Sequence, residues 1–316
     1  MSVKNRIIEQ IKVFTWNVTK GLSIHFNYWK CRHDRNALQN VMNSEETILF
    51  IKRHKCSVAR YGDGEFQMVE HFLSNMDDSS FSVDSFQNYD KTLAKKLYDT
   101  LTCPPPGMLV CIPYPMIDSS VYKGYNRTFF EREWLGRRRW LQGIIANRQK
   151  WGDSAFTRFY LNRTDINDYP HYISLFKGLW DGQDIILIEG EYSRLGVGND
   201  LFNNVSSIKR VLCPAKNAFA RYDQILSTAL SFDKNSLFLL ALGHTATVLA
   251  NDMCQQGYRA IDLGHIDIEY EWYKMKAKKK MPVINKYVNE VSEGRISGNE
   301  SFEDQEYQSQ IIAQIE

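Results

Sequence analysis

The chain has 316 residues, 43% of them hydrophobic, so it is long enough to bury one large core or two modest ones. Its 39 lysines and arginines nearly balance 37 aspartates and glutamates, and the resulting net charge of +2 gives no general electrostatic reason to expect nucleic acid as a partner. Six cysteines occur without a C-x-x-C pair, which disfavours a zinc site and a disulfide framework.

The first 43 residues form a basic, aromatic extension that differs from the rest of the chain. They contain no uninterrupted apolar core of the secretory type, and the sequence has no run of about 18 apolar residues that could span a bilayer. A cytoplasmic location is therefore expected. Residues 1–43 are predicted either to pack on the main domain as a helix or to contact the inner membrane surface or a partner enzyme.

The main domain is expected to begin at Ser44, where "SEETILFIKRH" offers a serine N-cap and acidic residues in the first helical turn. Apolar runs then alternate with helical patterns, most regularly from "DIILIEG" at residue 184 onward, with a helix expected from about Asp200. Continuous apolar strands are typical of sheets buried on both faces, and this alternation predicts a parallel sheet covered by helices. The sequence thus predicts an α/β, Rossmann-like domain over residues 44–290.

The last part of the chain, residues 291–316, follows a lysine-rich run and is acidic, polar and poor in large apolar side chains. Such a composition rarely supplies enough apolar surface to order a segment. It predicts a flexible C-terminal tail.

The loop "GDGE" follows the first expected strand and places Asp63 and Glu65 two residues apart. In an extended segment both carboxylates would point the same way, and the glycines Gly62 and Gly64 would let a phosphate approach the backbone. Two carboxylates with substrate phosphates are a common way to hold Mg²⁺ or Mn²⁺. The alternative is an ordinary turn with solvated acids.

Two later strand ends are also polar, and ligands of parallel α/β sheets bind at such ends. In "EGEYSRLGVGND", amides at an expected helix start, glycines and an arginine could form a diphosphate site, although a simple helix-start turn explains the pattern equally. In "CPAKNAFARY", a lysine could neutralise a phosphate. The candidate donor-binding residues of these loops are Glu189, Arg194, Gly198, Asn199, Lys216 and Asn217.

Two further strands each end in Gly-His, in "LGHTAT", which contains the binding candidate Thr245, and in "LGHIDIEYEW". If the second segment is extended, His265 and three acids (Asp267, Glu269 and Glu271) share one face and could act as general base, metal ligand or sugar clamp. A salt-bridged surface strand is the competing interpretation.

Three long stretches together carry a resemblance to a known family: "SVARYGDGEF", "EGEYSRLGVGNDLFNNVSSIKRVLCPAKNAFARY" and "ALGHTATVLANDMCQQGYRAIDLGHIDIEYEW". Over about residues 44–290 the sequence resembles the GT-D-type glycosyltransferases, a bacterial family long classed as a domain of unknown function. The resemblance implies a single Rossmann-like domain that transfers a sugar, typically glucose, from a UDP-sugar to a glycan on a protein or surface polysaccharide.

The family's metal-associated D-x-E motif corresponds to Asp63-Gly64-Glu65, and Arg60 belongs to the same pattern. Tyr61 replaces the phenylalanine common in the family, and His244 stands where a proline is usual, which leaves the backbone of that loop less defined. His265 and Glu271 fall on the family's Gly-His-Ile-Asp-Ile-Glu-Tyr-Glu-Trp signature, and both are expected to be needed for activity.

The resemblance implies that Asp63 and Glu65 hold a divalent cation, Mn²⁺ or Mg²⁺, against the diphosphate. Glu271, then His265, are the candidates for a general base if the reaction inverts, and the aromatic segment 151–160 is a candidate wall for the acceptor. A metal-dependent nucleotide-sugar hydrolase and a non-catalytic glycan-binding or scaffold protein are the alternative functions.

Overall fold

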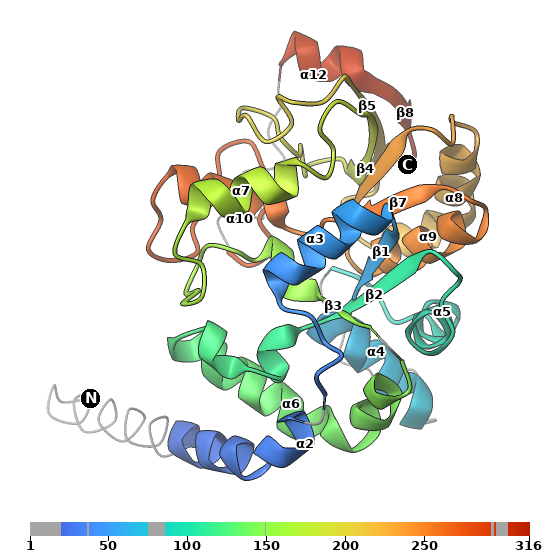
Figure 1. The fold of residues 1–316 in the computed structure, drawn as a ribbon. Coiled ribbons are helices and arrows are strands. Elements are labelled where there is room, and N and C mark those ends of the chain that lie inside the picture. Colours follow the sequence, from blue (N-terminus) through green and yellow to red (C-terminus); the bar gives the residue numbers. More distant parts are fainter. Residues whose placement is uncertain (1–19, 37, 75–85, 149, 292–293, 295–302) are drawn as a thin grey trace, which may run out of the picture.

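In a computed structural model the chain forms one eight-stranded, entirely parallel sheet between two layers of helices (Figure 1). The structure describes residues 20–36, 38–74, 86–148, 150–291, 294 and 303–316. The strand order is β3-β2-β1-β7-β6-β4-β5-β8. Their bounds are β1 Ser57–Arg60, β2 Met108–Ile112, β3 Gly152–Asp153, β4 Asp184–Gly190, β5 Ser207–Cys213, β6 Leu237–Ala241, β7 Arg259–Asp262 and β8 Ile311–Gln314. The predicted α/β parallel sheet is confirmed.

Helices cover both faces of the sheet because the strands are apolar on both sides. In β6, Leu237 and Leu239 pack into one core while Phe238 and Leu240 pack into the other. The helices are α2 Arg32–Asn36, α3 Ser44–His54, α4 Asp63–Ser74, α5 Lys91–Thr102, α6 Gly124–Ala146, α7 Tyr169–Lys177, α8 Tyr222–Leu230, α9 His244–Gln255, α10 Ile266–Lys274 and α12 Gln305–Gln310. Short 3₁₀ segments are η2 Tyr114–Met116, η3 Ser119–Val121, η4 Ser154–Thr157 and η5 Ala218–Arg221.

Helices α3, α7 and α10 pack on one face of the sheet, and α4, α5, α6, α8 and α9 contribute to the core on the other.

Two local predictions were wrong. The N-cap of α3 is Asn43, which forms a capping box with Glu46, so Ser44 is already helical. The helix expected from about Asp200 is absent, and residues 199–204 form bends and turns instead.

Residues 20–36 and 38–43 pack on the main domain rather than standing apart from it, while residues 1–19 and 37 lie outside the described part of the chain. Residues 20–30 are helical, and the hydroxyl of Tyr28 is buried and donates to the carbonyl of Ile117 at 2.8 Å. Asp34 pairs with Arg138 of α6 at 3.0 Å. The packed helix that was the simpler of the two predictions is confirmed for this stretch.

The prediction of a flexible C-terminal tail is wrong for residues 303–316. Strand β8 extends the sheet beside β5, as the red segment in Figure 1 shows. The side chains of Tyr307 and Ile315 in this stretch are buried, and Arg210 of β5 donates to Gln310 at 2.8 Å. The average composition of residues 291–316 is polar and therefore did not indicate that these two side chains are buried or that the segment pairs with β5.

Candidate active site

A cavity of about 560 Å³ opens at the carboxyl ends of β1, β6 and β7, where ligands of parallel sheets bind. Helix α4 borders it on one side and the first turns of α6 on another. Of the residues proposed from the sequence, those that line it are Arg60, Gly62, Asp63, Gly64, Glu65, His265, Asp267 and Glu269. Those that do not line it are Glu189, Arg194, Gly198, Asn199, Lys216, Asn217, Thr245 and Glu271.

Asp63 and Glu65 lie in the first turn of α4, not in an extended loop. Glu65 Oε2 accepts the backbone N–H of Gly62 at 2.8 Å, so this carboxylate also caps its own helix. Acidic side chains at a helix N-terminus are favourable because the amides there carry partial positive charge. Both carboxylates border the cavity, so they lie at one site as predicted, although they do so from a helix and not from an extended segment.

A second histidine, His244, reaches the cavity besides His265. It begins α9 directly after β6 and lines the cavity. Its Nε2 lies 4.0 Å from Glu65 Oε1 and so close to Gly64 that a Cβ added there would stand 2.4 Å away. Within the described part of the chain, its Nδ1 is buried and has no hydrogen-bond partner. His244 therefore belongs to the site, although the sequence marked it only as a departure from the family pattern.

Asp262, at the end of β7, is another cavity residue that the sequence did not single out. Burial, opposed by the nearby charge of Arg60, raises the pKa of Asp262 to about 6. Arg60 Nη1 lies 3.6 Å from Asp262 Oδ1, and the guanidinium covers Gly264, where a Cβ would stand 2.0 Å from Nη1. An acid that directly follows the buried, apolar residues Ala260 and Ile261 at the end of the strand was the available signal.

His265 is held neutral at the wall of the cavity. Burial, and then the charge of Arg158, lower its pKa to about 3. Arg158 Nη2 lies 3.0 Å from His265 Nδ1 and can only donate, so Nδ1 accepts and the ring proton is on Nε2. Neutral His265 is thus a hydrogen-bond donor, which disfavours the predicted role of general base.

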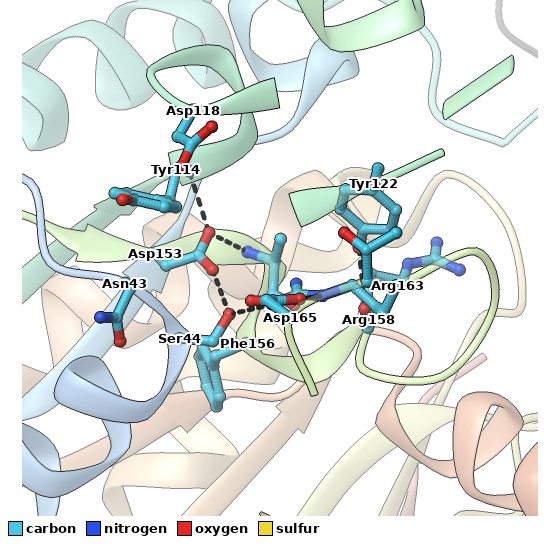
Figure 2. Close-up of polar contacts among 12 residues, drawn as sticks. Asn43, Ser44, Tyr114, Asp118, Tyr122, Asp153, Phe156, Arg158, Arg163 and Asp165 are labelled. Atoms are coloured by element: carbon cyan, nitrogen blue, oxygen red, sulfur yellow. Dashed lines mark hydrogen bonds and ion pairs between the residues drawn. The ribbon is translucent and has the colours of Figure 1, made fainter. Parts of the chain in front are cut away.

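Arg158 is in turn positioned by polar contacts, of which Figure 2 shows the one with Tyr122. The carbonyl of Arg158 accepts from the hydroxyl of Tyr122 at 2.8 Å, and its guanidinium pairs with Glu290 at 2.7 Å. Nearby, Asp153 accepts from the amide of Tyr114 at 2.9 Å and from the hydroxyl of Ser44. These contacts join the start of α3 to the segment that carries Arg158.

The segment 266–274 is helix α10, so the predicted single face of one histidine and three acids is wrong. Asp267 and Glu271, one turn apart, both pair with buried Lys286, at 2.7 and 2.9 Å. Glu269 lies on another side of the helix and accepts the amide of Tyr160 at 3.0 Å. Glu271 therefore anchors the chain near residue 286 and, among the described residues, is not part of the cavity lining.

The candidate residues in and after β4 and β5 do not line the cavity, and most of them make structural contacts instead. Glu189 is buried and pairs with Arg210 at 2.5 Å, and Arg194 donates to the carbonyl of Asn285 at 2.6 Å. No helix begins near Gly198, so the predicted cluster of helix N-terminal amides does not form there. The remaining candidates lie as follows: Asn199 donates to Asp267 and Glu271, Lys216 is exposed, Asn217 accepts from Gln87, and Thr245 is fully buried.

The predicted acceptor wall at residues 151–160 is largely core. Trp151, Phe156 and Phe159 are fully buried, so their rings cannot stack on a sugar. Only polar and small groups of this segment, Ser154 and Arg158 among them, line the cavity.

Asp63 and Glu65 suit a cation that takes its other ligands from substrate phosphates. The described part of the chain contains no group of three or more His, Cys, Asp or Glu side chains that could hold a metal ion. Asp63 and Glu65 supply two carboxylates, and one oxygen of Glu65 is already engaged by Gly62. Mg²⁺ typically binds one or two carboxylates together with substrate phosphates, which is the arrangement that these residues allow.

No helix in the described residues is long and apolar enough to cross a membrane.

Comparison with known proteins gives a consistent set of relatives. A family model described as the glycosyltransferase GT-D fold matches residues 58–291. The chain is 32% identical over 277 residues to glycosyltransferase GlyD of Streptococcus pneumoniae serotype 4 and 32% identical over 285 residues to the probable glycosyl transferase Gly of Streptococcus gordonii. Each match covers 87% of this chain but only 32% and 39% of the two relatives, so the chain spans well under half of their length.

Solved structures resemble nearly the whole chain. One, described as the highly conserved domain of unknown function 1792 with a distinct glycosyltransferase fold, is 37% identical with a TM-score of 0.80, and the match covers 90% of this chain and 99% of that one. Another, described as a new glycosyltransferase from Streptococcus sanguinis, is 30% identical with a TM-score of 0.77, covering 88% and 99%.

Proposed function

Because the chain belongs to the family of glycosyltransferases with the GT-D fold, we propose that it transfers a hexose, glucose in the first instance, from a UDP-sugar to a glycan acceptor. The observation that supports this most directly is the turn Asp63-Gly64-Glu65, which borders a cavity of about 560 Å³ at the carboxyl edge of the sheet. The volume is within the usual range of small-molecule sites.

The charges of the cavity support a divalent cation as part of the proposal. Asp63 and Glu65 would repel a diphosphate directly, so a nucleotide-sugar can bind beside them only with positive charge in between. Mn²⁺ or Mg²⁺ held by these two carboxylates would offset the charge that develops on the departing UDP. Because the donor's phosphates would complete the ligand set, the cation should bind more tightly when UDP is present.

Other side chains would bind and orient the donor. Arg60 and Arg158 border the cavity and add positive potential in a partly desolvated site. Neutral His265 would donate its Nε2–H to a phosphate or sugar oxygen. His244, beside Glu65 at the N-terminus of α9, would contact the same diphosphate, where helix amides also favour an anion.

UDP release measured with and without a glycan acceptor tests the proposal. A transferase releases UDP faster when acceptor is present, and release requires Mn²⁺ or Mg²⁺. Equal release with and without every acceptor would instead favour a nucleotide-sugar hydrolase, and no release at all would favour a glycan-binding or scaffold protein.

A peripheral contact of the N-terminal segment with an anionic membrane is a second, separate proposal. Leu22, Phe26 and Trp29 occupy one face of the helix at residues 20–30 and are each at least half exposed. Lys30 and Arg32 lie against this face, over the rings of Phe26 and Trp29. Exposed apolar side chains flanked by cations are typical of interfacial helices.

Sedimentation with lipid vesicles tests this contact. Replacing Leu22, Phe26 and Trp29 by serine should abolish binding to phosphatidylglycerol vesicles, whereas Leu73→Ser, at a partly exposed leucine of α4, should not. Equal sedimentation of both variants with the wild type would exclude this face as the contact.

A further inference from the structure

Helix α6 presents a stripe of side chains to the cavity that the sequence did not mark. Tyr125, Phe129 and Glu133 are four residues apart along the helix and all line the cavity. Residues at this spacing lie on one helical face, one turn above another. The stripe therefore crosses the cavity wall for two turns of α6.

The aromatic part of the stripe runs from solvent into the protein. Tyr125 is 73% exposed, Phe129 and Phe130 are half-buried, and Tyr122 is buried. Their rings form a connected series, with centroids 6.3 Å apart for Tyr125 and Phe129, 5.1 Å for Phe129 and Phe130, and 5.4 Å for Phe130 and Tyr122. A ring as exposed as that of Tyr125 contributes little to the core, so its place at the mouth of the cavity calls for another role.

The polar end of the stripe reaches the acidic turn of α4. Glu133 is mostly buried and pairs with Arg137 of its own helix. Glu133 and Asp63 line the same cavity, from α6 and α4 respectively. Asn126 lines the cavity beside the aromatic rings and adds an amide donor and acceptor.

We propose that this stripe of α6 is the acceptor subsite and that it binds a pyranose ring, stacked on Tyr125 and Phe129, with its hydroxyls toward Asn126 and Glu133. This inference rests on the proposed transfer reaction. A pyranose has an apolar face of C–H groups and a rim of hydroxyls, so it matches flat aromatic rings bordered by polar side chains. An acceptor seated here would extend from solvent toward Asp63, where the donor's phosphates are proposed to lie.

The test compares acceptor-stimulated and unstimulated UDP release with 4-nitrophenyl glucoside, galactoside and 2-acetamidoglucoside as acceptor probes. At least one probe should stimulate release by the wild type. Tyr125→Ala and Phe129→Ala should each raise the KM for that probe about fivefold, the equivalent of about 1 kcal/mol for one stacked ring. Phe129→Trp should restore the wild-type KM, and Trp29→Ala, at a half-exposed aromatic outside the cavity, should not alter it.

The outcomes separate this inference from the proposed function. Wild-type KM in both alanine variants would overturn the acceptor subsite, while acceptor-stimulated release by the wild type would still support the proposed transfer. Unstimulated release that no pyranoside increases would favour a hydrolase and would overturn the proposed transfer and the subsite together. Loss of release in the wild type would overturn the proposed function and the subsite with it. Thermal unfolding checks that Tyr125→Ala and Phe129→Ala remain folded, as the exposure of these side chains leads us to expect.

Discussion

Replacing His265 by asparagine should change how stability depends on pH. The Oδ1 of asparagine can take the place of Nδ1 as acceptor for Arg158, but it does not titrate. The pKa of His265 is about 3 in the folded protein and 6.5 in a model peptide. Below pH 6.5 the histidine is therefore protonated in the unfolded state but stays neutral in the folded state. The neutral ring thus contributes stability that is complete above about pH 6.5 and is lost as the pH falls.

The magnitude follows from this shift. At about pH 5 the solution is about 1.5 pH units below the pKa of the unfolded histidine, and at about 1.4 kcal/mol per unit the wild type loses at most about 2 kcal/mol that the variant keeps. One edge of the ring borders the cavity, which makes this value an upper limit.

Urea unfolding at about pH 7 and about pH 5, followed by tryptophan fluorescence, measures the effect. On acidification the free energy of unfolding of the wild type should fall by between about 1 and 2 kcal/mol more than that of His265→Asn. His54→Asn, at an exposed histidine that ends α3, controls for the loss of one imidazole. Parallel curves for wild type and His265→Asn would refute the argument that Arg158 and burial hold this ring neutral.

Four other changes test the site and its support. Asp63→Asn and Glu65→Gln should each lower sugar transfer by roughly a hundredfold or more while thermal unfolding shifts little, and unchanged turnover would make these acids bystanders. Lys286→Met should cost about 3–5 kcal/mol in urea unfolding, because two carboxylates including Asp267 lose a buried cation, and a loss below about 1 kcal/mol would contradict this. Removing residues 303–316 exposes surface covered by two buried side chains and should cost about 4 kcal/mol in calorimetry, whereas an unchanged melting temperature would show that β8 does not support the sheet.

The reassignment of two signature residues follows from their partners. Glu271 was the first candidate for a general base, but Lys286 and Asn199 already bind its carboxylate. His265 was the second, and Arg158 occupies the ring nitrogen that would have accepted a proton. These contacts favour another group as the base of an inverting reaction, and we expect Glu271 and His265 to hold and orient their neighbours.

The sequence by itself determined the layers of the fold and the place of the acidic turn. Unbroken apolar runs such as "DIILIEG" require burial on both faces, which only a sheet between helices provides. The turn "GDGE" follows the first of these strands, and the carboxyl ends of parallel strands meet at one edge, so its position near a ligand site follows from local pattern alone.

The tertiary structure decided which charges are available for chemistry. Arg158 lies 107 residues from His265 in the chain and yet fixes its protonation, and the aromatic stripe of α6 reaches the cavity only because that helix packs beside α4. Residues Ile311–Gln314 likewise form the edge strand β8 because they pair with β5, whose edge offers unpaired backbone groups. Solvation and pairing depend on neighbours brought together by folding, and no local pattern in the sequence records those neighbours.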